Sequence, residues 1–166
     1  MGKFRIEIKW AILFTVMMLV WMVLEKLAGL HGEHIDKHPI YTNFVAIPAI
    51  LMYVFALRDK RQNFYNGVMT YGQGFMAGLI MTAVVTLFSP LTQIITSLVI
   101  TPEYFPNVIK YSVEQGLMPQ EVAENYFNLK SYLMQVVIAT PIMGILTTAI
   151  VAIFTRKKAA GTGAVS

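Results

Sequence analysis

Four long apolar stretches divide this sequence, and they constrain its fold more than any other feature. They cover residues 8–30, 40–57, 71–98 and 132–154. Each comes close to or exceeds the roughly 20 residues that a helix needs to cross a hydrocarbon core of about 30 Å. Stretches of this length do not match the alternating segments of roughly 10 residues in a membrane β-barrel. We therefore predict an all-α polytopic membrane protein with four transmembrane helices.

The composition indicates that lipid hydrocarbon, not water, surrounds most of this chain. Of the 166 residues, 56% are hydrophobic and 13% are charged, against about 45–50% apolar and about 25% charged in soluble domains. A chain this short cannot hide so much apolar area in a water-soluble core. It contains no cysteine, which excludes a disulfide scaffold and thiolate metal sites. The net charge of +4 is divided among short loops, so we expect no nucleic-acid partner.

The basic residues predict the orientation. Most of the 13 Lys and Arg residues lie at the N-terminus, in the loop 58–70 and in the C-terminal tail, and cytoplasmic loops are enriched in these residues. We therefore expect a bacterial inner-membrane protein with both termini in the cytoplasm, and with the loop 31–39 and the segment 99–131 outside. Residues 1–154 would form one transmembrane domain, and residues 155–166 a short, basic, flexible tail. Because the first stretch lacks a convincing small-residue cleavage site, we expect an uncleaved helix rather than a signal peptide.

The segment between the third and fourth stretches contains residues that typically begin and end helices. Pro106 can begin a helix and Gly116 can end it, and Val108, Ile109 and Val113 share one face of that helix. Pro119 can begin a second helix, which we expect to run on into the fourth span. The segment is also rich in Tyr and Phe, which collect at the headgroup layer. We predict a short amphipathic helix at the outer interface.

Small and weakly polar residues recur along the third stretch at steps of three or four. They are Gly74, Gly78, Thr82, Thr86, Ser89, Gln93 and Ser97, and the fourth stretch carries a shorter set at Thr140, Gly144 and Thr148. Between helices in lipid, such residues allow close backbone approach and hydrogen bonds. We predict that the two sets pack against each other or against other spans. Homodimerisation through Gly74 and Gly78, and a polar path for a substrate or ion, are the alternatives. Pro90 and Pro141 are expected to kink their helices.

Glu25 is the most unusual residue, because it interrupts an otherwise apolar helix. An ionised carboxylate at mid-bilayer costs about 2.5–3.5 kcal/mol on insertion scales, so an ionisable residue in a span is a candidate for function. Asn43 and Gln93 are the other intramembrane polar candidates. In the structural alternative, Glu25 only reaches the headgroups or pairs with Lys26 or a histidine.

All histidines of the chain fall in the loop after the first span: His31, His34 and His38. Imidazole and carboxylate are good zinc ligands, and His34 and His38 would share a face if the loop were helical. Gly32 and Pro39 instead favour a turn. We therefore treat the three as weak metal candidates, beside the alternatives of hydrogen-bonding loop residues and a pH-sensitive contact.

Several motifs resemble a known family. They are Trp21-x-x-x-Glu25-x-x-x-Gly29-Leu30-His31, His38-Pro39-Ile40-Tyr41-Thr42-Asn43-Phe44 and Tyr71-Gly72-Gln73-Gly74-Phe75, followed by Gly78. With these motifs the chain resembles, up to about Phe154, the bacterial membrane family catalogued as domain of unknown function 4199. The resemblance implies a four-span inner-membrane protein. It implies no activity, ligand or catalytic residue.

No nucleotide-binding loop or hydrolase motif is present in the sequence, so we expect no enzyme, no catalytic residue and no cofactor. Our first hypothesis is a structural or accessory component of a membrane complex, in contact with the bilayer and with a second copy or another membrane protein. The alternative is a small transporter or a proton- or ion-coupled protein that uses Glu25, Asn43, Gln93 and the polar stripe. A membrane enzyme that acts on lipid headgroups through Glu25 and the histidine loop ranks third.

Overall fold

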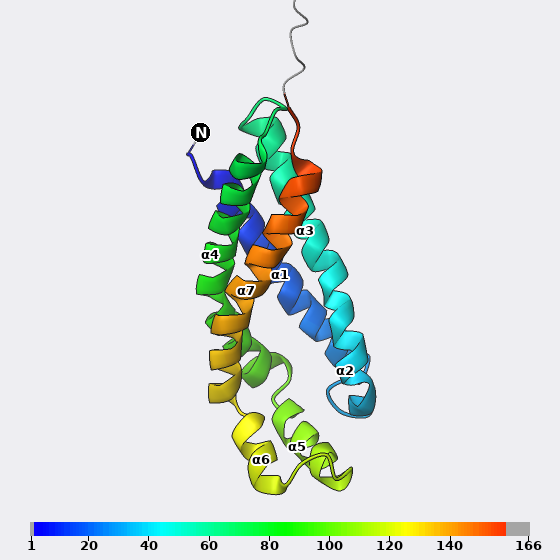
Figure 1. Cartoon of the computed structure of the whole chain (residues 1–166). Coiled ribbons are helices and arrows are strands. Elements are labelled where there is room, and N and C mark those ends of the chain that lie inside the picture. Colours follow the sequence, from blue (N-terminus) through cyan, green and yellow to red (C-terminus); the bar gives the residue numbers. More distant parts are fainter. Residues whose placement is uncertain (1, 159–166) are drawn as a thin grey trace, which may run out of the picture.

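The computed structural model describes residues 2–158, and four long helices dominate it (Figure 1). They are α1 (Arg5–Leu27), α3 (Ala46–Asn63), α4 (Tyr71–Ile95) and α7 (Leu129–Thr155). Each belongs to a helical segment that is long and apolar enough to cross a membrane. The prediction of an all-α polytopic membrane protein with four spans is confirmed. Of the predicted tail, residues 159–166 lie outside the described part of the chain.

The second helix is longer than its apolar stretch predicted. It continues beyond Leu57 to Asn63, so Arg58 and Lys60, which we assigned to a loop, lie on its last turns. Lys and Arg are good helix formers, and positive charge is stabilised near a helix C-terminus. The loop between α3 and α4 is correspondingly short. At its other end, α3 is preceded by helical turns, so that the apolar helical segment begins at Ile35.

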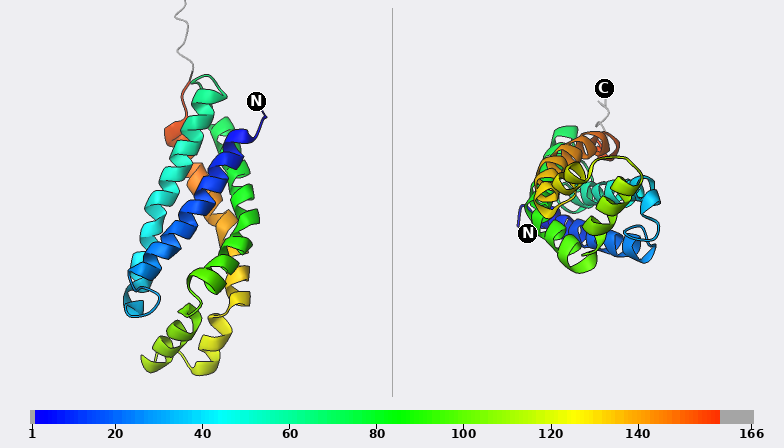
Figure 2. Two further views of the ribbon diagram at one scale, coloured as in Figure 1. Left: turned by 180° about the vertical axis from the view of Figure 1, so that it is seen from behind. Right: turned by 90° about the horizontal axis from the view of Figure 1, so that it is seen from below.

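Both ends of the described chain lie at one end of the bundle, which we call the proximal end, and the short helices α2 (His38–Tyr41), α5 (Tyr104–Glu114) and α6 (Gln120–Tyr126) lie at the opposite, distal end (Figure 1). The four long helices converge at the proximal end. Towards the distal end, the pair α1 and α3 diverges from the pair α4 and α7 (Figure 2). The bundle therefore has the shape of a V that is closed at its proximal end.

Helices α4 and α7 pack closely through their small residues. A Cβ atom added to Gly78 would overlap the side chain of Thr148, and one added to Gly144 would overlap Thr82. Thr82 is buried and its hydroxyl lies 2.8 Å from the hydroxyl of Tyr53 on α3. Part of each predicted stripe therefore lies at the α4–α7 interface, and the contact extends to a third helix.

The proximal end is fastened by buried polar contacts. Lys60 Nζ lies 2.8 Å from Glu7 Oε1, and the two residues are each 3% exposed. Arg61 donates to the backbone carbonyl of Thr155 at 2.8 Å. The loop before α4 and the end of α7 also exchange two backbone hydrogen bonds, between Met69 and Lys157. All four long helices are thus linked at this end.

The distal segment differs from prediction in one respect. The helix that begins after Pro119 does not run on into the fourth span, because it ends at Tyr126 and α7 begins anew at Leu129. Asn128, in extended conformation, lies between them and accepts a hydrogen bond from the Ser131 backbone at 2.9 Å. Asn competes with helical backbone hydrogen bonds and favours the N-cap position. The amphipathic helix predicted before Gly116 is present as α5.

Candidate functional site

The candidate site is built on the C-terminal end of α1. Ala28 is the last residue of right-handed conformation there, and Gly29 follows with φ of 76°. The amide of Leu30 donates to the carbonyl of Glu25 at 3.0 Å, and that of Gly29 to Lys26 at 2.9 Å. This pair of hydrogen bonds is a Schellman motif, which ends a helix and reverses the chain. The reversal returns the next residue, His31, to the side of Glu25.

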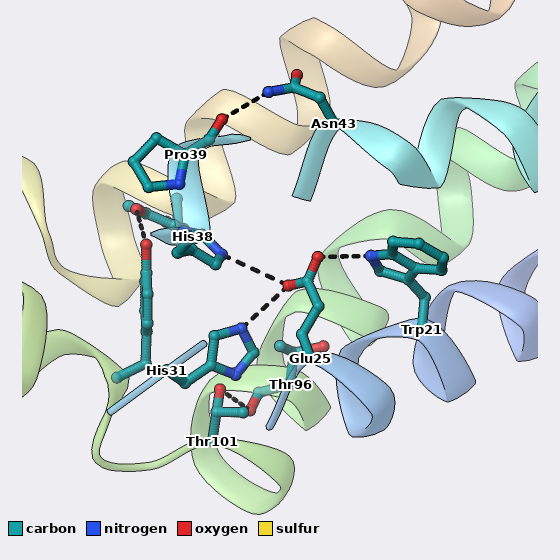
Figure 3. Close-up of polar contacts among 10 residues, drawn as sticks. Trp21, Glu25, His31, His38, Pro39, Asn43, Thr96 and Thr101 are labelled. Atoms are coloured by element: carbon teal, nitrogen blue, oxygen red, sulfur yellow. Dashed lines mark hydrogen bonds and ion pairs between the residues drawn. The ribbon is translucent and has the colours of Figure 1, made fainter. Parts of the chain in front are cut away.

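Glu25 lies at the centre of a buried cluster with His31, His38 and Trp21 (Figure 3). Its Oε2 atom lies 3.0 Å from His31 Nε2 and 3.4 Å from His38 Nε2. Its Oε1 atom accepts a hydrogen bond of 2.5 Å from Trp21 Nε1. Glu25 is 2% exposed and His31 is 7% exposed. The carboxylate is therefore shielded by the protein itself and does not face lipid.

His38 reaches the cluster from a different element. It is the first residue of α2, and Pro39 follows it at a position where the missing amide of proline costs no hydrogen bond. A 3-10 turn at Ile35–Lys37 leads the chain from the end of α1 to this point. The loop between the first two spans thus folds back over the distal end of α1, and both imidazoles approach the same carboxylate oxygen.

Helix α5 covers the cluster from the other arm of the V. The ring of Tyr104 lies 5.2 Å from each of the two imidazole rings, measured between centroids. Its hydroxyl lies 3.3 Å from that of Tyr132 on α7. Burial raises the pKa of Tyr104, so its hydroxyl stays protonated at neutral pH. Asn107 donates to the backbone carbonyl of His31 at 2.9 Å and so links α5 directly to the histidine loop.

Two cavities lie next to the cluster, inside the V. One of about 150 Å³ is lined by both histidines, Thr42, Gln93 and Tyr104. A second, of about 120 Å³, lies among α1, α4 and α7. Met22, Gln93 and Thr96 line both cavities. Since a water molecule occupies about 30 Å³ of liquid volume, each cavity has room for a small hydrated solute.

The predicted polar residues are divided between the cavities and other positions. Gln93 lines both cavities, whereas Ser89 and Thr140 line the second. Asn43 is exposed and donates to the carbonyl of Pro39 at 2.6 Å, directed away from the cluster (Figure 3). The expectation that Asn43 lines the polar cavity is therefore wrong. Its neighbour Thr42 occupies that place.

The structure also separates the three histidines. His34 does not join the cluster, and its ring lies beside Gly29 instead. The loop is not one continuous helix, so the pair His34 and His38, four residues apart, does not share a face. The pair that forms is His31 and His38. Sequence reasoning attached no role to Trp21, although its spacing of four residues before Glu25 was the signal that could have indicated a contact.

The fold and these contacts define an integral membrane protein with four helical spans and a buried carboxylate–histidine cluster. Comparison with protein families gives a match over residues 9–157 to a family described as "Protein of unknown function (DUF4199)". The chain belongs to this family. Searches of curated proteins and of solved structures found no match to the chain.

Proposed function

We propose that this protein is a small transporter of the bacterial inner membrane, not an enzyme, that takes a cation or another small polar solute from the outer side into its helical bundle. One observation carries the proposal. His31 and His38, whose imidazoles contact the Glu25 carboxylate, line one cavity, and Gln93 lines both that cavity and the second one, which is also lined by polar residues of α4 and α7. An ionisable group within a membrane-spanning helix is expensive, which favours a role for Glu25 in binding or conduction.

The two ends of the bundle differ in a way that supports entry of the solute from the outer side. The proximal end is fastened by the buried pair Glu7 and Lys60, whereas the helix pairs diverge at the distal end, where the cluster lies. Most Lys and Arg residues of the sequence also lie at or near the proximal end, which supports a cytoplasmic location for that end. The solute would then enter from the periplasmic side and stop where the helices converge.

Uptake into liposomes tests this proposal. Purified protein is reconstituted into liposomes that contain either a fluorescent zinc indicator or a pH indicator, and gradients of Zn²⁺ or protons are applied. We expect at least one probe to enter faster than in protein-free liposomes. Gln93→Leu should reduce that rate about tenfold, since one lost buried polar contact costs about 1–3 kcal/mol.

Gln135→Leu is the matched control, because Gln135 lies on the exposed face of α7, away from both cavities. It should leave the uptake rate unchanged. Rates equal to those of protein-free liposomes for both probes would contradict the proposal. So would equal losses in the two Gln variants.

A structural or accessory role is our second proposal. Gly78 and Gly144 face Thr148 and Thr82 within the chain, so this part of the stripe is not free to bind a second copy or another membrane protein. What favours a partner is a groove on the exposed face of α7, along Met134, Ile138 and Ile142, which would be its contact surface. Cross-linking through cysteines introduced there would detect it.

A further inference from the structure

We propose that Glu25, His31 and His38 together form a binding site for a divalent transition-metal ion, with Zn²⁺ as the ion that fits best. The site deepens the proposed function and rests on it for its role, because it names the ion that the cavity would receive. The binding itself can be tested without transport.

The spacing of the three side chains supports the site. Zinc bonds of about 2.0–2.1 Å at tetrahedral angles of about 109° place neighbouring ligand atoms about 3.3–3.4 Å apart. Glu25 Oε2 lies 3.0 Å from His31 Nε2 and 3.4 Å from His38 Nε2. All three ligand atoms lie within 4.8 Å of one another. Small side-chain rotations would therefore bring them to the distances of a zinc centre.

Surrounding contacts restrain two of the three groups, the Glu25 carboxylate and the backbone that carries His31. Trp21 binds Glu25 Oε1, which leaves Oε2 to face the imidazoles. The Schellman motif at Gly29 and the bond from Asn107 fix the backbone of His31. Such supporting contacts orient metal ligands and raise affinity.

The ligand set also selects the class of ion. One carboxylate and two neutral imidazoles carry a charge of −1, which a divalent cation offsets. Ca²⁺ and Mg²⁺ require six or more oxygen ligands, mostly carboxylates, carbonyls and waters, whereas imidazole favours Zn²⁺, Cu²⁺, Ni²⁺ and Co²⁺. Three protein ligands leave one coordination position, and the adjoining cavity of about 150 Å³ can supply a water molecule or solute to it. Such an open position is typical of zinc sites that exchange a ligand.

Equilibrium binding tests the site directly. The full chain, free of any affinity tag, is purified in dodecyl maltoside, treated with EDTA and titrated with ZnCl₂ by calorimetry at neutral pH. We expect one Zn²⁺ per chain. Glu25→Gln, His31→Gln and His38→Gln should each weaken binding at least tenfold. His34→Gln should bind as the wild type does, because His34 lies outside the cluster.

A measurement on the unaltered chain covers the case in which a variant fails to fold. Co²⁺ added to the EDTA-treated wild type should give the intense visible absorption of four-coordinate cobalt, and equimolar Zn²⁺ should remove it. Weak absorption typical of six-coordinate cobalt would overturn the inference. Zinc binding that is lost only in His34→Gln, or that is equal in all variants, would overturn it too.

The site and the transport proposal can fail separately. One Zn²⁺ bound per chain without uptake of either probe would support the site and contradict transport. Uptake of protons by a chain that binds no Zn²⁺ would support transport and overturn the metal site.

Discussion

The contact between Gly78 and Thr148 makes a quantitative prediction about the α4–α7 interface. A methyl group at residue 78 would meet three atoms of Thr148, including Cβ at 2.9 Å, and Thr148 is completely buried. A β-branched side chain is stiff at χ1 and cannot rotate away freely. Overpacking of this kind costs about 1–3 kcal/mol, and the rigid neighbour favours the upper part of that range. Gly78→Ala should therefore lose about 3 kcal/mol of packing free energy.

Gly72→Ala is the matched control in the same helix, since a Cβ there would meet nothing within 4 Å. Replacing Gly by Ala in a helix interior gains up to about 1 kcal/mol from propensity, and Gly72, in the first turn of α4, gains no more than this. Their difference in unfolding free energy therefore reports the packing cost to within about 1 kcal/mol. We therefore expect Gly78→Ala to be about 2–3 kcal/mol less stable than Gly72→Ala, and about 2 kcal/mol less stable than the wild type.

The assay is unfolding by SDS in dodecyl maltoside micelles, followed by the fluorescence of Trp10 and Trp21 on α1, which packs against α4. Gly78→Ala should unfold at a lower SDS fraction than the wild type. Adding Thr148→Ala should restore only part of the loss, because its Cβ remains. Equal stability of Gly78→Ala and Gly72→Ala would refute this account of the interface.

Two further predictions concern other parts of the bundle. Lys60→Met leaves Glu7 buried without its partner, which should cost about 3–5 kcal/mol of unfolding free energy. The double variant with Glu7→Leu should recover most of that loss. SDS titration measures both variants, and a double variant no more stable than Lys60→Met would contradict the prediction. Gly29→Ala places a side chain at φ of 76°, which should cost about 1–2 kcal/mol and displace His31. Gly116→Ala, at φ of 65° after α5, is the control for Gly29→Ala. It should cost a similar unfolding free energy but leave the zinc affinity unchanged. Equal zinc affinity in the two variants would count against the role of Gly29.

The sequence predicted the fold well because the bilayer imposes a length on each span. Helix boundaries were less accurate for local reasons. The helix α3 continues through Lys60 because charged residues end an apolar stretch without ending a helix. The helix after Pro119 ends early because Asn128 caps a new one, and hydropathy does not register that competition.

The site was predicted only in part. Glu25 and Gln93 stood out because polar residues in a span are costly. The pairing of His31 with His38 could not be read from helical spacing, because it depends on the reversal at Gly29 and on the turns that follow. The contribution of α5 through Tyr104 and Asn107 requires the three-dimensional arrangement of segments far apart in the chain.

The fastening of the proximal end determines where this molecule is most compliant. The helices are joined there by contacts of Glu7 with Lys60, Arg61 with Thr155 and Met69 with Lys157. Bending of the bundle therefore has its largest amplitude at the distal ends of the two helix pairs. The hydrogen bond from Asn107 to the His31 carbonyl connects the distal ends of the two helix pairs. A change in the distance between these distal ends therefore acts first on the backbone of His31.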